Sequence, residues 1–314
     1  MKDKLRQTLL PLITSFIWGA AFVAQEICAE NNIGAFTFNT VRYLIAVIFL
    51  TFVIAAGRIF GRRKNDTAAD GADNGKKTKS KKSLIIGGIL CGAALTVASN
   101  FQQAGMSAGT DAGKAGFITA LYVVLVPIFG LFFGKKLNFH TVIAVVLSVA
   151  ALYLLCIKGS LTIAPGDLLI LICAVCFAGH ILIIDRFSAD CDGILLSTVQ
   201  FLTAGLLSGI GMFIFEKPDL SVIFASALPL LYAGVFSCGI GYTLQIIAQK
   251  NSNPTVTSVL LSMESLFSVI TSAVILHHKM TVSEYIGCAL MLAAVIITQI
   301  PTPAERKRKA EQNE

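Results

Sequence analysis

The feature that most constrains this chain is a series of long apolar runs. Runs of roughly 17 to 25 apolar residues recur along the sequence, and each is long enough to cross the hydrocarbon of a bilayer as a helix. The hydrophobic share is 55% and only 14% of the residues are charged, whereas a soluble domain has about 25% charged residues. The sequence therefore predicts an all-α membrane protein whose first partner is the lipid bilayer.

Two pairs of these runs resemble each other. The segment 112–157 contains two apolar spans joined by a short basic hinge, and the segment 255–300 repeats that arrangement. Placing Lys136 over Lys279 aligns the two hairpins without a gap, although few side chains are identical. A second match, near the start of each half, supports the same division. We interpret the chain as one unit of about 160 residues used twice.

The apolar runs predict ten helices, five in each unit. The expected ranges are 8–28, 36–57, 84–104, 113–134, 140–157, 167–187, 193–215, 223–249, 254–276 and 283–300. The first repeat covers 8–157 and the second covers 167–300. The segment 58–83 is basic and almost without apolar side chains, so we expect a disordered loop there and a similar basic tail at 301–314.

The distribution of Lys and Arg predicts the orientation of the chain. With both termini in the cytoplasm, the inner segments hold twenty of these residues and the outer loops hold three, and short loops rich in Lys and Arg stay in the cytoplasm. Because each unit has an odd number of spans, the second enters the membrane from the opposite side. The expected fold is ten transmembrane helices arranged as two antiparallel five-helix repeats, with a site between the halves near the midplane.

Several segments, taken in order, resemble a known family. They are FIWGAAFVAQ in the first span, FTFNTVRYLIA in the second, AGKAGFITALYVVLVPIFGLFFGKK in the fourth and SVLLSMESLFSVI in the ninth. Together they are similar to the EamA family of the drug/metabolite transporter (DMT) superfamily over essentially the whole membrane domain. The resemblance implies a 5+5 inverted-repeat carrier in a bacterial inner membrane, often an exporter of amino acids or other small metabolites. Members commonly carry Glu after the fourth and ninth spans, where this chain has Lys135 and His278.

Glu264 is the deepest acid of the chain and the candidate for coupling. It lies about ten residues into the ninth span, on the order of 15 Å along the axis, hence near the midplane. Ionisable groups at that depth are costly and mark a pathway or a pair. We expect Glu264 to line the cavity and exchange protons during transport; the alternative is a carboxyl group that only holds helices together.

Glu26 and Arg42 are expected at similar depth near the outer ends of the first two spans. A buried charge without a partner is expensive, so the sequence predicts an ion pair between them. The pair is either structural or part of an outer gate, with an anion contact as the further alternative for Arg42.

Other polar side chains, most of them at helical spacing from one another, are candidates for the cavity wall. They are Asn100, Gln103, Thr119, Tyr122, His180, Tyr242 and Gln245. Amides and hydroxyls also hold membrane helices together, typically for about 0.6 kcal/mol per contact, so each either lines the cavity or only packs helices. His180 stands alone on an apolar face, which favours packing.

Motifs for other functions are missing from the sequence. No Walker loop, nucleophile elbow or zinc-peptidase motif occurs, which argues against nucleotide-driven pumping and against an enzyme. Cys173 and Cys176 have the spacing of a metal pair, but no second pair completes a site, so neither a metal nor another cofactor is expected. The basic residues flank apolar spans, which favours membrane topology over nucleic-acid binding.

The sequence thus predicts a secondary transporter that moves a small polar or amphipathic metabolite by alternating access, in the export direction, with protons as the candidate coupling ion. Two other classes remain as alternatives: an intramembrane enzyme and a lipid-binding or scaffold protein. The polar inventory fits a zwitterion, a sugar or a nucleobase equally well, so the sequence does not identify the substrate.

Overall fold

The computed structural model describes residues 2–62, 74–134, 137–156, 164–250, 252–275, 281–298 and 300. Regular structure in these ranges is entirely helical, and eight helical spans among them are long and apolar enough to cross a membrane. Two shorter apolar helices accompany these spans, α6 (Phe139–Cys156) and α14 (Val282–Thr298). The predicted all-α class and membrane character are therefore confirmed for the described part of the chain.

The first half of the chain folds into a sequence of six helices. They are α1 (Lys2–Glu30), α2 (Ala35–Arg62), α3 (Asn74–Ser107), α4 (Ala112–Ala120), α5 (Tyr122–Phe132) and α6. The second half follows the same plan with more interruptions. Its elements are α7 (Pro165–Ser188), α8 (Gly193–Phe215), α9 (Leu220–Ala225), α10 (Ala227–Leu231), the π-helix η1 (Tyr232–Tyr242), α11 (Thr243–Gln249), α12 (Pro254–Leu261), α13 (Met263–Ile275) and α14.

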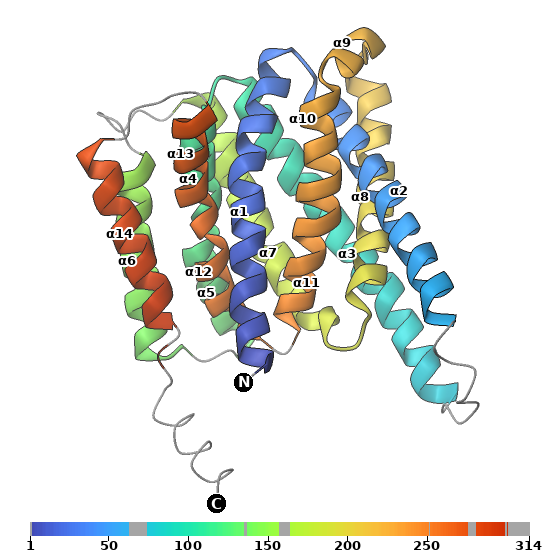
Figure 1. Ribbon diagram of the computed structural model, residues 1–314, viewed down its shortest axis with the longest axis horizontal. Helices are drawn as coiled ribbons and strands as arrows, with labels where there is room; N and C mark the ends of the chain where they lie inside the picture. Colours follow the sequence, from blue (N-terminus) through green and yellow to red (C-terminus); the bar gives the residue numbers. More distant parts are fainter. Residues whose placement is uncertain are drawn as a thin grey trace, which may run out of the picture.

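The helices form one bundle in which the two halves run in opposite directions. In Figure 1, α1 begins and α14 ends at one end of the bundle, called here the near end. The helix α1 ends at the opposite end, called the far end, where α4 and α7 begin. The first helix of each half therefore points the opposite way, as antiparallel repeats require.

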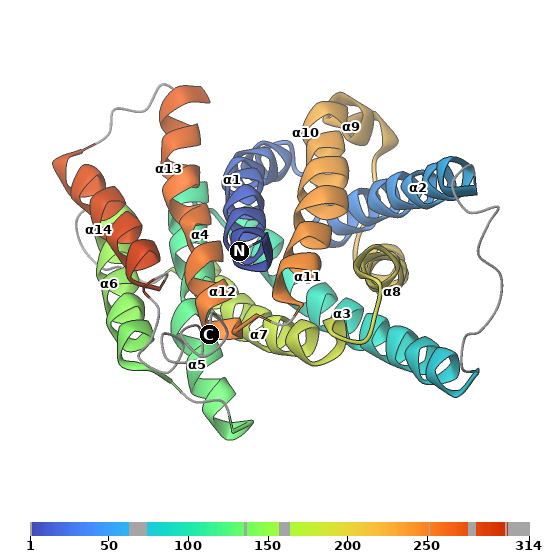
Figure 2. The same cartoon turned by 60° about the horizontal axis from the view of Figure 1, so that its bottom comes forward.

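The contacts between helices repeat when the halves are exchanged. The helix α3 packs against α7, and η1 and α11 pack against α1. Likewise α4 contacts α7 while α12 contacts α1, and α2 contacts η1 while α8 contacts α3. The pairs α2 with α8 and α6 with α14 contact each other directly, and Figure 2 shows the second pair together at one side of the bundle. This reciprocal packing fits the two-repeat architecture.

Two spans predicted to be regular throughout each contain one tight turn near the middle, called here a break, at which the backbone keeps right-handed helical angles. The break in the predicted helix 113–134 lies at Leu121, where tight bonds accompany a regular one: the Leu121 N–H donates to the Ile118 carbonyl, and the Leu121 carbonyl accepts from the N–H groups of Val124 and Leu125. The predicted helix 254–276 is interrupted at Ser262. In the alignment of Lys136 with Lys279, the two breaks lie within about two residues of each other. The breaks are therefore a repeated feature of the fold.

The predicted span 223–249 is also divided. It breaks at Ser226, three residues before Pro229, which has no N–H to donate to the preceding turn. The wider turn of η1 then brings its backbone close to neighbouring helices. A Cβ at Gly234 would lie 2.5 Å from Ile45, and a Cβ at Gly241 would lie 2.8 Å from Nε1 of Trp18. Glycine is needed at both positions for this packing.

The expected loop 58–83 is shorter than predicted. The helix α2 continues to Arg62 and α3 begins at Asn74, so both ends of the segment are helical. The reason is that Lys and Arg have high helix propensity and extend helices beyond the apolar spans. Residues 63–73 and the tail 301–314 lie outside the described residues, as do Lys135 and His278.

Candidate functional site

A small internal cavity lies between the two halves. Its volume is about 30 Å³, enough for one or two water molecules. Both halves contribute to its wall, through α1 to α5 on one side and α7, η1 and α13 on the other. The lining residues are Trp18, Ala21, Phe22, Gln25, Arg42, Gln102, Thr119, Tyr122, Phe177, Ser237, Tyr242 and Glu264. The cavity is a small, partly open space at the interface of the repeats.

The two helix breaks meet at this cavity. Tyr122 is the first residue of α5 and Glu264 is the second residue of α13, so each follows a break. The Tyr122 hydroxyl donates a hydrogen bond of 2.9 Å to Oε1 of Glu264, and both side chains are buried. Around this contact α4 packs against α13 and α5 packs against α12. One hydrogen bond therefore joins the two breaks across the interface of the repeats.

An amide from α3 faces the cavity, one residue away from the amide that was predicted. Gln102 lines the cavity and donates a 3.1 Å hydrogen bond to the hydroxyl of Thr119. The predicted Gln103 instead donates to the backbone carbonyl of Gln25 at 3.1 Å. Successive residues on a helix differ by about 100°, so this assignment depends on the rotation of α3. Gln25 also lines the cavity, and its side-chain oxygen has no hydrogen-bond partner in the part of the chain that the structure describes.

Aromatic rings form another part of the wall. The rings of Trp18 and Tyr242 lie 4.6 Å apart, and Nε1 of Trp18 donates a 3.2 Å hydrogen bond to the backbone carbonyl of Ser237 in η1. The sequence contains a single tryptophan, so Trp18 fluorescence reports on this cavity alone. This contact ties α1 of the first half to η1 of the second.

Arg42 is buried without the predicted partner. The ion pair between Glu26 and Arg42 is not formed: the charged side chains near Glu26 are Asp111 and Glu30, and none of the described carboxylates lies beside Arg42. Glu26 is half-buried and lies beside the backbone N–H of Ala112 at the start of α4. The prediction was wrong because similar depth in neighbouring helices does not place two side chains on facing sides.

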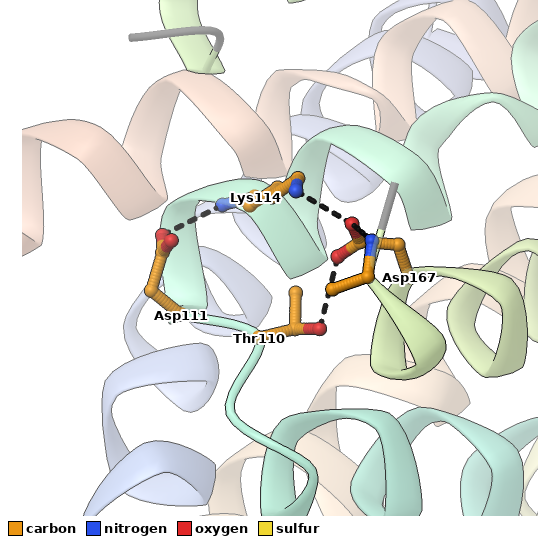
Figure 3. A network of polar contacts seen from close by, with 5 residues as sticks. Thr110, Asp111, Lys114 and Asp167 are labelled. Carbon is orange, nitrogen blue, oxygen red and sulfur yellow. Dashed lines mark hydrogen bonds and ion pairs between the residues drawn. The ribbon is translucent and has the colours of Figure 1, made fainter. Parts of the chain in front are cut away.

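A polar network connects the two halves at the far end. Nζ of Lys114, in the first turn of α4, lies 2.5 Å from Oδ2 of Asp167, in the first turn of α7. The Thr110 hydroxyl donates to Oδ1 of Asp167 at 3.0 Å, and the backbone N–H of Ala164 donates to Oδ2 at 2.7 Å. Figure 3 shows Lys114 and Thr110 converging on Asp167, with Asp111 bonded to the Lys114 backbone. Closure of this end thus includes a contact between charges.

Comparison with known proteins agrees with the two-unit organisation. A model of the EamA-like transporter family matches residues 6–157 and again residues 164–300. The chain belongs to the EamA-like transporter family. An uncharacterized transporter of Archaeoglobus fulgidus is 29% identical over 290 residues, covering 92% of this chain and 84% of the relative. A solved crystal structure of a protein superposes with a TM-score of 0.73 at 18% identity, covering 96% of this chain and 98% of the other, which shows a shared fold.

EamA-like membership and the transporter relative support a multi-pass membrane transporter rather than an enzyme. They confirm the family that the sequence resembles. The two matched segments also correspond to the two sets of helices whose contacts repeat each other.

The remaining predicted site residues of this EamA-like chain lie away from the central cavity. Asn100 lines a separate groove of about 750 Å³ at the far end, where it accepts from Asn39 at 3.1 Å and donates to Ser208 at 3.0 Å. His180 is fully buried and its Nε2 lies 2.8 Å from Oε1 of Gln200. Gln245 is buried, and its side-chain oxygen has no partner in the described part of the chain.

Four of the eight predicted wall residues therefore meet at the cavity. They are Thr119, Tyr122, Tyr242 and Glu264. The sequence reasoning missed Gln25 and Gln102 as wall residues. A signal existed for Gln102, because the adjacent Gln103 belonged to the predicted polar stripe of the same helix.

Proposed function

We propose that this protein is a secondary transporter that moves a small metabolite by alternating access through the central cavity, in the export direction. The observation that carries the proposal is the small cavity between two antiparallel repeats, at the point where the breaks of two helices meet. Inverted-repeat transporters bind their substrates at such places, between the repeats and on interrupted helices.

The broken helices divide the interface into two layers. The far layer contains α4 and α13, which contact each other, and the near layer contains α5 and α12, which also contact each other. Figure 1 shows the two layers stacked along the bundle. Because a break interrupts each helix between the layers, one layer can separate while the other stays packed. Opening the far and near layers in turn exposes the cavity to one side of the membrane at a time.

We further propose that the chain crosses the inner membrane ten times and that both termini lie in the cytoplasm. The helices α6 and α14 have 18 and 17 residues, or about 27 and 26 Å of helix, which reaches the lower limit for a span. Reporter fusions test this arrangement. A fusion after Asn32 should report the outside and a fusion after Gly75 the cytoplasm, and the same side for both would refute antiparallel repeats.

Glu264 is the proposed site of proton coupling. It is the one carboxylate among the cavity-lining residues, and Tyr122 donates its hydroxyl hydrogen bond to it. The other titratable groups that face it are Tyr242 from η1 and Cys173 from α7, with Arg42 on the same cavity wall. When either layer opens, water reaches the carboxyl group and a proton can exchange with that side.

The test uses purified protein in proteoliposomes. A thermal-shift screen against a metabolite panel first identifies a ligand, since a ligand at 100 times its Kd adds about 2.7 kcal/mol of stability. Saturable flux and counterflow of that ligand are expected from a carrier. Product formation without flux would support the intramembrane enzyme, and binding without flux would support the lipid-binding or scaffold alternative.

Glu264→Gln separates coupling from transport itself. Glutamine keeps the shape and hydrogen-bonding capacity of the side chain but cannot titrate. We expect the variant to bind and exchange substrate and to lose uptake driven by a pH gradient. The matched control is Glu30→Gln, which neutralises an exposed carboxylate at the end of α1. Gradient-driven transport by Glu264→Gln at the wild-type rate would refute the coupling role.

A further inference from the structure

Arg42 is the single basic residue on the wall of the central cavity. Eleven of the twelve lining residues are apolar, neutral polar or acidic, and only Arg42 carries a positive charge. It lies about seven residues after the start of α2, and its side chain is 2% exposed. Burying a charge without a counter-charge is costly, so a guanidinium in this position requires an explanation.

The contacts of Arg42 inside the protein do not neutralise its charge. Its Nη2 lies 3.4 Å from the Tyr43 hydroxyl, and its guanidinium carbon lies 4.9 Å from the ring centre of Phe38 and 5.1 Å from that of Tyr43. Ring faces attract a cation but carry no net charge. The Nε atom is buried and has no hydrogen-bond partner among the described residues, and no described carboxylate forms an ion pair with Arg42.

We propose that Arg42 is the anion subsite of the cavity and receives one carboxylate group of the transported solute. The inference rests on the proposed function, because it assumes that the solute occupies this cavity. The planar guanidinium presents N–H groups in a fork that matches the two oxygens of a carboxylate. The unpartnered Nε supplies one of these donors.

Charge balance favours a monocarboxylate over a phosphate. One guanidinium compensates one negative charge, whereas a phosphate carries up to two near neutral pH. The other ionisable group on the wall that can carry a charge opposite to that of Arg42 is Glu264, which, when ionised, disfavours a second negative charge on the solute. With Glu264 protonated, the wall carries one positive charge, and a solute with a single carboxylate leaves the cavity neutral.

The first test compares matched probes on wild-type protein in detergent. Formate and formamide have the same number of heavy atoms, and both are small enough for a cavity of about 30 Å³ to admit them with little expansion. At fixed pH and ionic strength, formate should give a saturable change in Trp18 fluorescence and raise the melting temperature, and formamide should do neither. Free N-acetyltryptophanamide corrects for collisional quenching.

Two results from this series would overturn the assignment. Equal responses to formate and formamide would show that charge is not recognised. A stronger response to inorganic phosphate than to formate would show that the subsite is not built for a single negative charge. Acetate and acetamide serve as a second pair, so that the conclusion does not depend on one probe.

Substitution then locates the subsite. Arg42→Gln should weaken formate binding by at least about tenfold, and Arg42→Lys should weaken it less, because it keeps the charge and loses the fork. The matched control is Arg186→Gln, which removes an exposed guanidinium of α7, and it should bind formate like the wild type. Unchanged binding by a folded Arg42→Gln would refute the proposal. If Arg42→Gln does not fold, the wild-type probe series decides.

Flux measurements separate this inference from the proposed function. If a carboxylate is transported saturably and its amide is neither transported nor a competitor, the result supports both the carrier function and the anion subsite. Equal transport of a carboxylate and its amide refutes the subsite and leaves the carrier intact. Absence of saturable flux for every ligand, with selective formate binding retained, refutes the carrier and leaves the subsite.

Discussion

Replacing Lys114 with Met is expected to shift the protein toward a state that is open at the far end. Nζ of Lys114 lies 2.5 Å from Oδ2 of Asp167, and the contact joins the first turn of α4 to the first turn of α7. These helices belong to different repeats, so any movement that separates the repeats at this end must break the contact. The ion pair therefore stabilises the closed state specifically.

The burial of the two partners sets the size of the effect. The Asp167 side chain is 5% exposed and the Lys114 side chain is 26% exposed. A hydrogen bond to a charged group contributes about 1.5 to 3 kcal/mol, and a fully exposed ion pair about 0.2 to 1 kcal/mol. The partial exposure of Lys114 places this contact at about 1 to 2 kcal/mol, which changes the ratio of closed to open molecules by about 5- to 30-fold.

The single tryptophan provides the assay. Iodide does not cross the bilayer. In vesicles in which the far end of every molecule faces outward, iodide added outside therefore quenches Trp18 only when the far end is open. Lys114→Met should raise the quenching constant, whereas Lys114→Arg keeps the charge and should resemble the wild type. Adding Asp167→Asn to Lys114→Met removes the carboxylate that has lost its counter-charge and favours opening. The quenching constant of the double variant should therefore lie between those of the wild type and Lys114→Met. Equal quenching in all four proteins would refute the role of this contact in closure.

Two further predictions concern stability in detergent. Glu26→Gln and Arg42→Gln should lower the free energy of unfolding additively, within about 0.5 kcal/mol in a double-mutant cycle, because the structure does not pair these residues; strong coupling would show that they meet. Gly19→Ala should lower the free energy of unfolding by about 1 to 3 kcal/mol, because its new Cβ would lie 2.5 Å from Cβ of Phe267 and 2.8 Å from backbone atoms. The matched control is Gly179→Ala, which meets nothing within 4 Å and should be neutral or stabilising; equal melting temperatures for the two variants would contradict the close approach at Gly19.

The sequence was sufficient to predict the all-helical class and the eight long apolar spans, but not their interruptions. Apolar runs predict helices because every backbone N–H and C=O in hydrocarbon must be paired within the chain. The breaks at Leu121 and Ser262 have no Gly or Pro at the break itself, so local sequence gives no signal for them. The π-helix at Tyr232–Tyr242 likewise depends on close packing around its glycines. Both features arise from contacts between helices, which a single sequence does not specify.

Depth in the membrane was easier to predict than direction around a helix axis. The position of Glu264 within its span placed it near the middle of the bundle, and it does line the cavity. Choosing between Gln102 and Gln103 required the rotation of α3, and pairing Glu26 with Arg42 required the rotations of two helices. An error of one residue changes direction by about 100°, so these assignments needed the structure.

The two ends of the bundle differ in a way that bears on the proposed export direction. In the gapless alignment of the repeats, the counterpart of Lys114 in α4 is Thr257 in α12. Thr257 is neutral, and its hydroxyl lies 3.2 Å from the Ser252 hydroxyl. The far contact between α4 and α7 thus includes an ion pair, and the equivalent position in the near contact between α12 and α1 contributes no charge. This single contact resists opening of the far layer and has no charged counterpart in the near layer. If the near end faces the cytoplasm, as we propose, solute loads there while Lys114 and Asp167 remain paired, and binding energy from the solute is then needed to separate them, which is consistent with the proposed export.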